Sequence, residues 1–124
     1  MRALGLPVRL ALMLLAMTSG KVWAQACLVH SQAERLDVKV CQENLNIPKD
    51  LFRDGFCKPQ LAGQKTEVTF SESCPAGAFG ICSNAQVANM PYHENIHYYG
   101  IASDALYLKP FCEGQSKGKW LTPD

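Results

Sequence analysis

Six cysteines constrain this chain more than any other feature of its sequence. They are Cys27, Cys41, Cys57, Cys74, Cys82 and Cys112. An even number of cysteines without a C-x-x-C pair predicts disulfide bonds formed in an oxidising compartment, rather than a zinc cluster. Because a chain of 124 residues buries only a modest core, we expect these cross-links to stabilise the fold.

The segment that precedes the first cysteine is typical of a secretory signal peptide. Arg2 and Arg9 bracket a basic start, the apolar run 10–17 follows, and small or apolar residues end at Ala24. The run is shorter than the ~20 apolar residues of a membrane span. We predict a signal peptide at 1–24, a single disulfide-rich domain at 25–124, a periplasmic or secreted location, and no stable membrane insertion after cleavage. Lipidation of Cys27 is an alternative, although it would leave an odd number of thiols.

The charge of the mature chain argues against nucleic acid as a partner. Three of the 12 basic residues (Arg2, Arg9 and Lys21) leave with the signal peptide and none of the 11 acidic ones do, so the net charge becomes −2. No basic run remains that would bind nucleic acid or an anionic membrane surface.

The cysteines also fall into an internal repeat with an offset of 55 residues. This shift takes Cys27 to Cys82 and Cys57 to Cys112, and it lays "LFRDGFCKPQLAG" over "LYLKPFCEGQSKG" without a gap. Chance similarity is the alternative explanation. We interpret the match as two pseudo-repeats, at residues 27–70 and 82–124.

The repeat predicts how the cysteines pair, because equivalent cysteines should form equivalent bonds. The expected disulfides are Cys27–Cys57 and Cys82–Cys112, which leaves Cys41–Cys74 as the third.

Alternation of apolar and charged residues predicts strands at "RLDVKVC" (35–41) and "TEVTFS" (66–71), with a helix capped by Asn46 between them. The second repeat has the β-forming run "IHYYGI" (96–101), a helix that Pro110 should end, and a final strand "KWL". The glycine-rich "CPAGAFGIC" (74–82) is expected to be a tight connection. These elements predict an α+β fold, with two strand–helix–strand pseudo-repeats on a largely antiparallel sheet.

One motif suggests enzymatic chemistry. "HENIH" places His93, Glu94 and His97 in the H-E-x-x-H pattern, in which two histidines bind zinc and the glutamate is the general base. That geometry requires a helix, whereas Tyr98, Tyr99 and the repeat register favour a strand, in which the two imidazoles would lie roughly 13 Å apart. We therefore predict no metal, no cofactor and no catalytic residue, and keep a zinc-dependent hydrolase as the alternative.

Tyrosines gather in the second repeat, and tyrosine is favoured at protein interfaces. Tyr92, His97 and Tyr99 are our candidates for contacts with a protein partner, while ordinary packing of these side chains is the alternative.

Several short motifs follow one another in an order that resembles a group of small exported bacterial proteins. The motifs are a helix-borne Cys57, Cys74-Pro75, Gly80-Ile81-Cys82, Tyr98-Tyr99, a second helix-borne Cys112 and Lys119-Trp120. The resemblance covers about 80 residues from Cys41 onward and departs after the last cysteine, where Glu113 and Gly114 replace a glycine-rich end. It implies export and a fold, and it carries no established activity.

Together these features favour a non-enzymatic, periplasmic protein-binding module. An inhibitor, such as an immunity protein that neutralises a toxin delivered to the periplasm, is the form of this function that we expect. A structural protein of the envelope is a further alternative.

Overall fold

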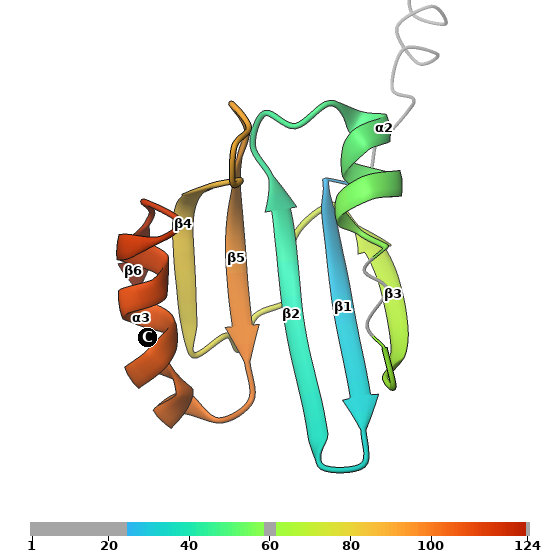
Figure 1. Cartoon of the computed structure of the whole chain (residues 1–124), viewed down its shortest axis with the longest axis vertical. Helices are drawn as coiled ribbons and strands as arrows, with labels where there is room; N and C mark the ends of the chain where they lie inside the picture. Colours follow the sequence, from blue (N-terminus) through green and yellow to red (C-terminus); the bar gives the residue numbers. More distant parts are fainter. Residues whose placement is uncertain (1–24, 59–61, 124) are drawn as a thin grey trace, which may run out of the picture.

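A computed structural model describes residues 25–58 and 62–123, and the predicted signal peptide lies outside them. The described residues form the predicted α+β fold, built on a six-stranded sheet (Figure 1). The strands are β1 (Ala26–Ala33), β2 (Leu36–Asn44), β3 (Lys65–Ser71), β4 (Gly80–Gln86), β5 (His93–Tyr99) and β6 (Lys119–Leu121). Their order across the sheet is β3-β1-β2-β5-β4-β6, and every neighbouring pair is antiparallel.

Two short helical segments complete the fold. The first is α2 (Lys49–Leu51), which continues into a π-type turn, η2 (Phe52–Phe56). The second is a 3₁₀ turn, η3 (Ala102–Asp104), that leads into α3 (Ala105–Gly114). Among the described residues, no helix is long and apolar enough to cross a membrane.

Two predictions about helix ends were wrong. Asn46 does not cap α2, because its side-chain oxygen accepts the backbone N–H of His93 instead. Pro110 does not end α3, which runs on to Gly114. The turn after Pro110 is held by the bond from the Gln115 N–H to the Phe111 carbonyl and by the disulfide at Cys112, and these contacts compensate for the donor that proline lacks.

The two halves of the chain have the same order of elements: strand, strand, helix, strand. The predicted repeat units therefore lacked their first strands, β1 and β4. Part of the predicted connection 74–82 belongs to β4, which begins at Gly80. The alternation in β4 is interrupted by a register shift between Cys82 and Ala85, where Asn84 has φ 56°, and this irregularity obscures the strand pattern in the sequence.

The pairing of β2 with β5 shows that the halves are related by an approximate twofold axis. Lys39 lies opposite Tyr99, and Asn44 lies opposite Glu94. In the row between them, Gln42 lies opposite Ile96, with Cys27 beside Gln42 and Cys82 beside Ile96, so exchanging the halves maps this row onto itself and keeps every side chain on its own face. The axis therefore passes through the seam between β2 and β5, in the middle of the sheet.

The three disulfides are those that the repeat predicts: Cys27–Cys57, Cys41–Cys74 and Cys82–Cys112. Cys27, Gln42, Ile96 and Cys82 lie directly opposite one another on successive strands, so their side chains share one face of the sheet. Two of the bonds thus attach the two helical segments to the same side, which we call the helix face.

The other side, the open face, carries Cys41 and its neighbour His97. Cys41 bonds to Cys74, which lies in the connection 72–79 between the two halves. This third disulfide attaches the connection to the open face.

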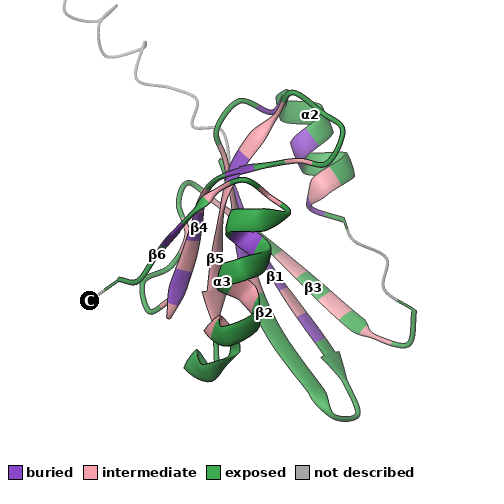
Figure 2. Cartoon of the chain, turned by 60° about the vertical axis from the view of Figure 1, so that its left-hand side comes forward, coloured by how far each residue is buried: buried purple, intermediate pink, exposed green. Residues whose placement is uncertain are grey.

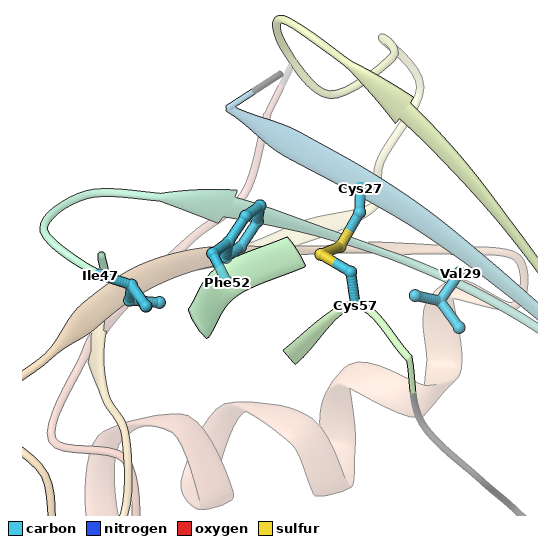
Figure 3. Close-up of a cluster of buried hydrophobic side chains, with 5 residues drawn as sticks. All are labelled: Cys27, Val29, Ile47, Phe52 and Cys57. Carbon is cyan, nitrogen blue, oxygen red and sulfur yellow. A yellow bond between two sulfur atoms is a disulfide. The ribbon is translucent and has the colours of Figure 1, made fainter. Parts of the chain in front are cut away.

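The apolar core of the described residues is divided in two. One cluster lies beneath α2 and η2 and contains Cys27, Val29, Ile47, Phe52 and Cys57 (Figure 3). The other lies beneath α3 and contains Cys82, Ala85, Cys112 and Trp120. Each cluster is centred on one disulfide, and Figure 2 shows that the hairpin joining β1 to β2 extends beyond both helices as exposed surface.

Reduction of the disulfides should destabilise the fold strongly, because each small core is built around one bond. Each bond is expected to contribute about 2–4 kcal/mol, so full reduction should lower the melting temperature by at least about 15 °C in a domain of this size. The measurement is a thermal melt followed by circular dichroism with and without reductant. An unchanged midpoint after complete reduction would contradict this expectation.

Gly80 is required by the close approach of an aromatic ring. A Cβ atom at this position would lie 1.9 Å from Cζ2 of Trp120. We expect Gly80→Ala to lower the free energy of unfolding by roughly 1–3 kcal/mol. Gly114→Ala is the control, since its Cβ would meet nothing within 4 Å, and it should be neutral or slightly stabilising. Equal unfolding free energies for both variants in denaturant titrations would refute the steric argument.

Candidate functional site

The "HENIH" segment forms strand β5, as predicted. Its side chains alternate, so Glu94, Ile96 and Tyr98 lie on the helix face, while His93, Asn95, His97 and Tyr99 lie on the open face. Glu94 is therefore on the opposite side of the sheet from the two histidines, which is not the arrangement of a zinc peptidase. Among the described residues, no group of three histidine, cysteine or acidic side chains is placed to hold a metal ion.

The structure does not bring the three predicted contact residues together. His97 Nε2 lies 3.4 Å from Oε1 of Glu43, and the Tyr99 hydroxyl donates to the Pro75 carbonyl at 2.7 Å, both on the open face. Tyr92 packs against the first core cluster, on the helix face. Partial burial and the nearby Glu43 carboxylate raise the pKa of Tyr99. His97 and Tyr99 thus already have partners within the chain.

An apolar cavity lies elsewhere, on the helix face between the two helical segments. Its floor is formed by Val38 and Val40 of β2 together with Tyr98 of β5. Phe79, Ile101, Tyr107 and Leu108 form the wall on the α3 side, and the cavity volume there is about 310 Å³. Tyr99 also borders this cavity. We call this feature, together with its extension across β1, the β2 groove.

The groove extends across β2 toward the first repeat. There it is lined by Val29, Ser31, Leu36, Gln42 and Gln64, and it shares Val38 and Val40 with the other side. Leu36 and Val38 are 40% and 37% exposed, while Ile101 and Tyr107 at the α3 wall are 70% and 73% exposed. A contiguous exposed patch of this kind marks a binding surface more often than an isolated exposed leucine does.

The positions of the helices explain why the groove exists. α2 and η2 are attached above β1 by Cys27–Cys57, and α3 packs on β4 and β6, where Cys82–Cys112 holds it. Both helices therefore cover outer strands. The first half of β2, near the middle of the sheet, is left without a covering element on its apolar side (Figure 1).

Sequence reasoning missed this groove because Val38 and Val40 have the pattern of ordinary core residues. One available signal was α3, whose sequence "ALYLKPFC" is apolar on nearly every side, unlike a typical surface helix. Leu106, Tyr107 and Phe111 are indeed more than half exposed. A helix of this composition leaves large apolar side chains exposed on the surface of the domain.

The groove offers little ionisable chemistry. Asp37, Lys39 and Asp104 border it, and Asp37 pairs on the open face with His30. The Tyr98 ring stacks on Trp120, with ring centroids 5.7 Å apart, and burial together with the charge of Glu94 raises the pKa of its hydroxyl. The arrangement is suited to holding apolar side chains by contact and water exclusion.

Comparison of the chain with models of protein families, with curated proteins and with solved structures finds no match. What the structure itself establishes is a small, cysteine-rich, disulfide-bonded domain. Three disulfides are typical of proteins in an oxidising, extracytoplasmic compartment.

Glu94 is the one acidic residue among those described that is buried. It lies between Asn44 of β2 and Ala85 of β4, and its Oε1 atom has no hydrogen-bond partner in the described part of the chain. The Asn44 amide is already engaged with the backbone of Ile47. Burial raises the pKa of Glu94 from 4.5 to about 7.

The stability of the domain should therefore depend on pH through Glu94. A raised pKa in the folded state means that folding favours the protonated carboxyl, so its contribution is fully present below about pH 4.5. This contribution, roughly 3 kcal/mol in total, is lost as the pH rises through about 7. Glu94→Gln should remove most of this pH-dependent loss of unfolding free energy, and should therefore stabilise the protein at pH 8. Denaturant titrations at several pH values test this, with the exposed Glu67→Gln as the control. If the free energy of unfolding of Glu94→Gln falls with pH as much as that of the parent protein, Glu94 is not the group responsible.

Proposed function

We propose that this protein is a non-enzymatic binding module of the bacterial periplasm, which holds an apolar segment of another protein in the β2 groove. An inhibitor that neutralises a toxin or enzyme in that compartment is the form of this function that we favour. The observation that carries the proposal is the groove itself: a concave apolar surface, with Val38 exposed on its floor, between two disulfide-anchored helices.

The rigidity of the frame supports a binding function. Both walls are attached to the sheet covalently, through Cys27–Cys57 and Cys82–Cys112, so the groove does not need to be ordered when a partner arrives. A preorganised surface loses less conformational entropy on binding than a flexible one. This feature is suited to tight and specific binding.

The chemistry of the lining defines the partner segment. The floor is made of valine and tyrosine side chains, and the exposed Tyr107 at the wall offers a ring that can cover an inserted side chain. Aromatic side chains of this kind carry much of the binding energy in protein interfaces. We expect the partner to insert an uncharged segment with two or more large apolar side chains.

The test uses peptides selected for binding to the oxidised protein from a displayed random library. Val38→Asp places a carboxylate on the apolar floor and should weaken the selected peptides by about tenfold or more, because the charge would be buried without a partner. Gln32→Asp is the matched control, since it introduces the same carboxylate at an exposed position of β1 on the open face. Both variants should melt near the parent protein.

Binding should also require Tyr107. We expect Tyr107→Ala to reduce affinity for the selected peptides without lowering the melting temperature, since this side chain is 73% exposed. Peptides that bind Val38→Asp as tightly as the parent protein, or a library that yields no binder, would overturn the proposal.

A further inference from the structure

The sheet ends on one side at β3, a strand of seven residues that pairs with β1 alone among the described strands. The register with β1 runs from Lys65 to Ser71 without a bulge, and the strand contains no proline. No other described strand pairs with the backbone donors and acceptors on its outer side. Edges of this kind are templates for pairing with another strand, and folded proteins commonly shorten, bend or cover them. The opposite edge, β6, has three residues.

We propose that β3 pairs antiparallel with β3 of a second copy of this chain, so that one sheet continues through both copies. The twofold axis would pass through Val68, because this register alone pairs all seven residues of the strand. This inference is independent of the proposed function of the β2 groove.

The side chains of β3 are compatible with this register on the helix face. Val68 would lie opposite the partner's Val68, and Thr66 opposite the partner's Phe70. Phe70 is 39% exposed in the single chain, and a cross-strand neighbour would cover part of it. Pairs of β-branched and aromatic residues are favourable cross-strand neighbours.

The charged side chains on the open face are also compatible with this register of β3 against β3. Lys65 would lie opposite the partner's Ser71, and Glu67 opposite the partner's Thr69, so no charge directly faces a like charge. Lys65 and Glu67 are neighbours on the same strand, with 4.0 Å between Nζ and Oε1, and both point into solvent rather than toward the edge. They therefore do not block the edge as an inward-pointing charge would.

Pairing of β3 with β3 of a second copy also gives a closed dimer. Pairing β3 with a partner's β6 would be head-to-tail and would propagate into open chains, whereas β3 with β3 uses the same surface twice and stops at two copies. A ladder of seven residues is smaller than a standard protein interface of about 1,600 Å². We accordingly expect dissociation at micromolar to millimolar concentrations.

The experiment exploits Thr69, which is exposed on the open face and would lie opposite the partner's Glu67. Thr69→Glu places two pairs of like charges across the axis and should raise the dissociation constant of the dimer by about tenfold at low salt. Thr69→Lys places two pairs of opposite charges there and should lower it. Sedimentation velocity of the oxidised protein from about 10 µM to about 1 mM measures both effects.

The two variants control for each other, because they alter the same exposed position, and their melting temperatures show that each is folded. The register is supported if the dimer of Thr69→Glu is weaker and the dimer of Thr69→Lys is tighter than that of the parent protein. Both differences should disappear in high salt. A parent protein that remains monomeric at about 1 mM, or two variants that associate equally, would overturn the proposal.

Discussion

The fold depends on one row of side chains that crosses the sheet and on the two disulfides at its ends. Cys27 and Cys82 lie in this row, separated by Gln42 and Ile96 of the two central strands. Each cysteine bonds to a helical segment 30 residues further along the chain. Helices of this length are marginal by themselves, and each core cluster of the described residues is small. The bonds therefore supply the attachment that a larger core would otherwise provide.

The same two attachments determine where the surface is apolar. Because each helix is held over an outer strand, the core divides into two clusters and the beginning of β2 remains uncovered between them. A single long helix across the middle of the sheet would have buried Val38 and Val40 and left no groove. The β2 groove is thus a direct result of placing these two cross-links toward the sides of the sheet rather than at its centre.

Much of the fold could be predicted from the sequence, because its evidence is local or periodic. The 55-residue offset predicted two disulfides and left the third by elimination. Strict alternation located β2 and β3, while the β-forming run at 96–101 and the repeat register located β5. β4 was missed because its bulge at Asn84 breaks the alternation. The β2 groove and the burial of Glu94 could not be derived in this way, because both depend on where the helices lie over the sheet, and the sequence pattern of Val38 is the same whether or not a helix covers it.

The seam between β2 and β5 has the symmetry of an interface between two identical chains. Cys41 precedes Gln42 as Asn95 precedes Ile96, so the second half has no cysteine at the equivalent position, and Cys74 lies in the connection that joins the halves. The third disulfide therefore falls outside the twofold symmetry, and it makes the otherwise equivalent halves distinguishable by fixing the connection to the open face of the first half alone.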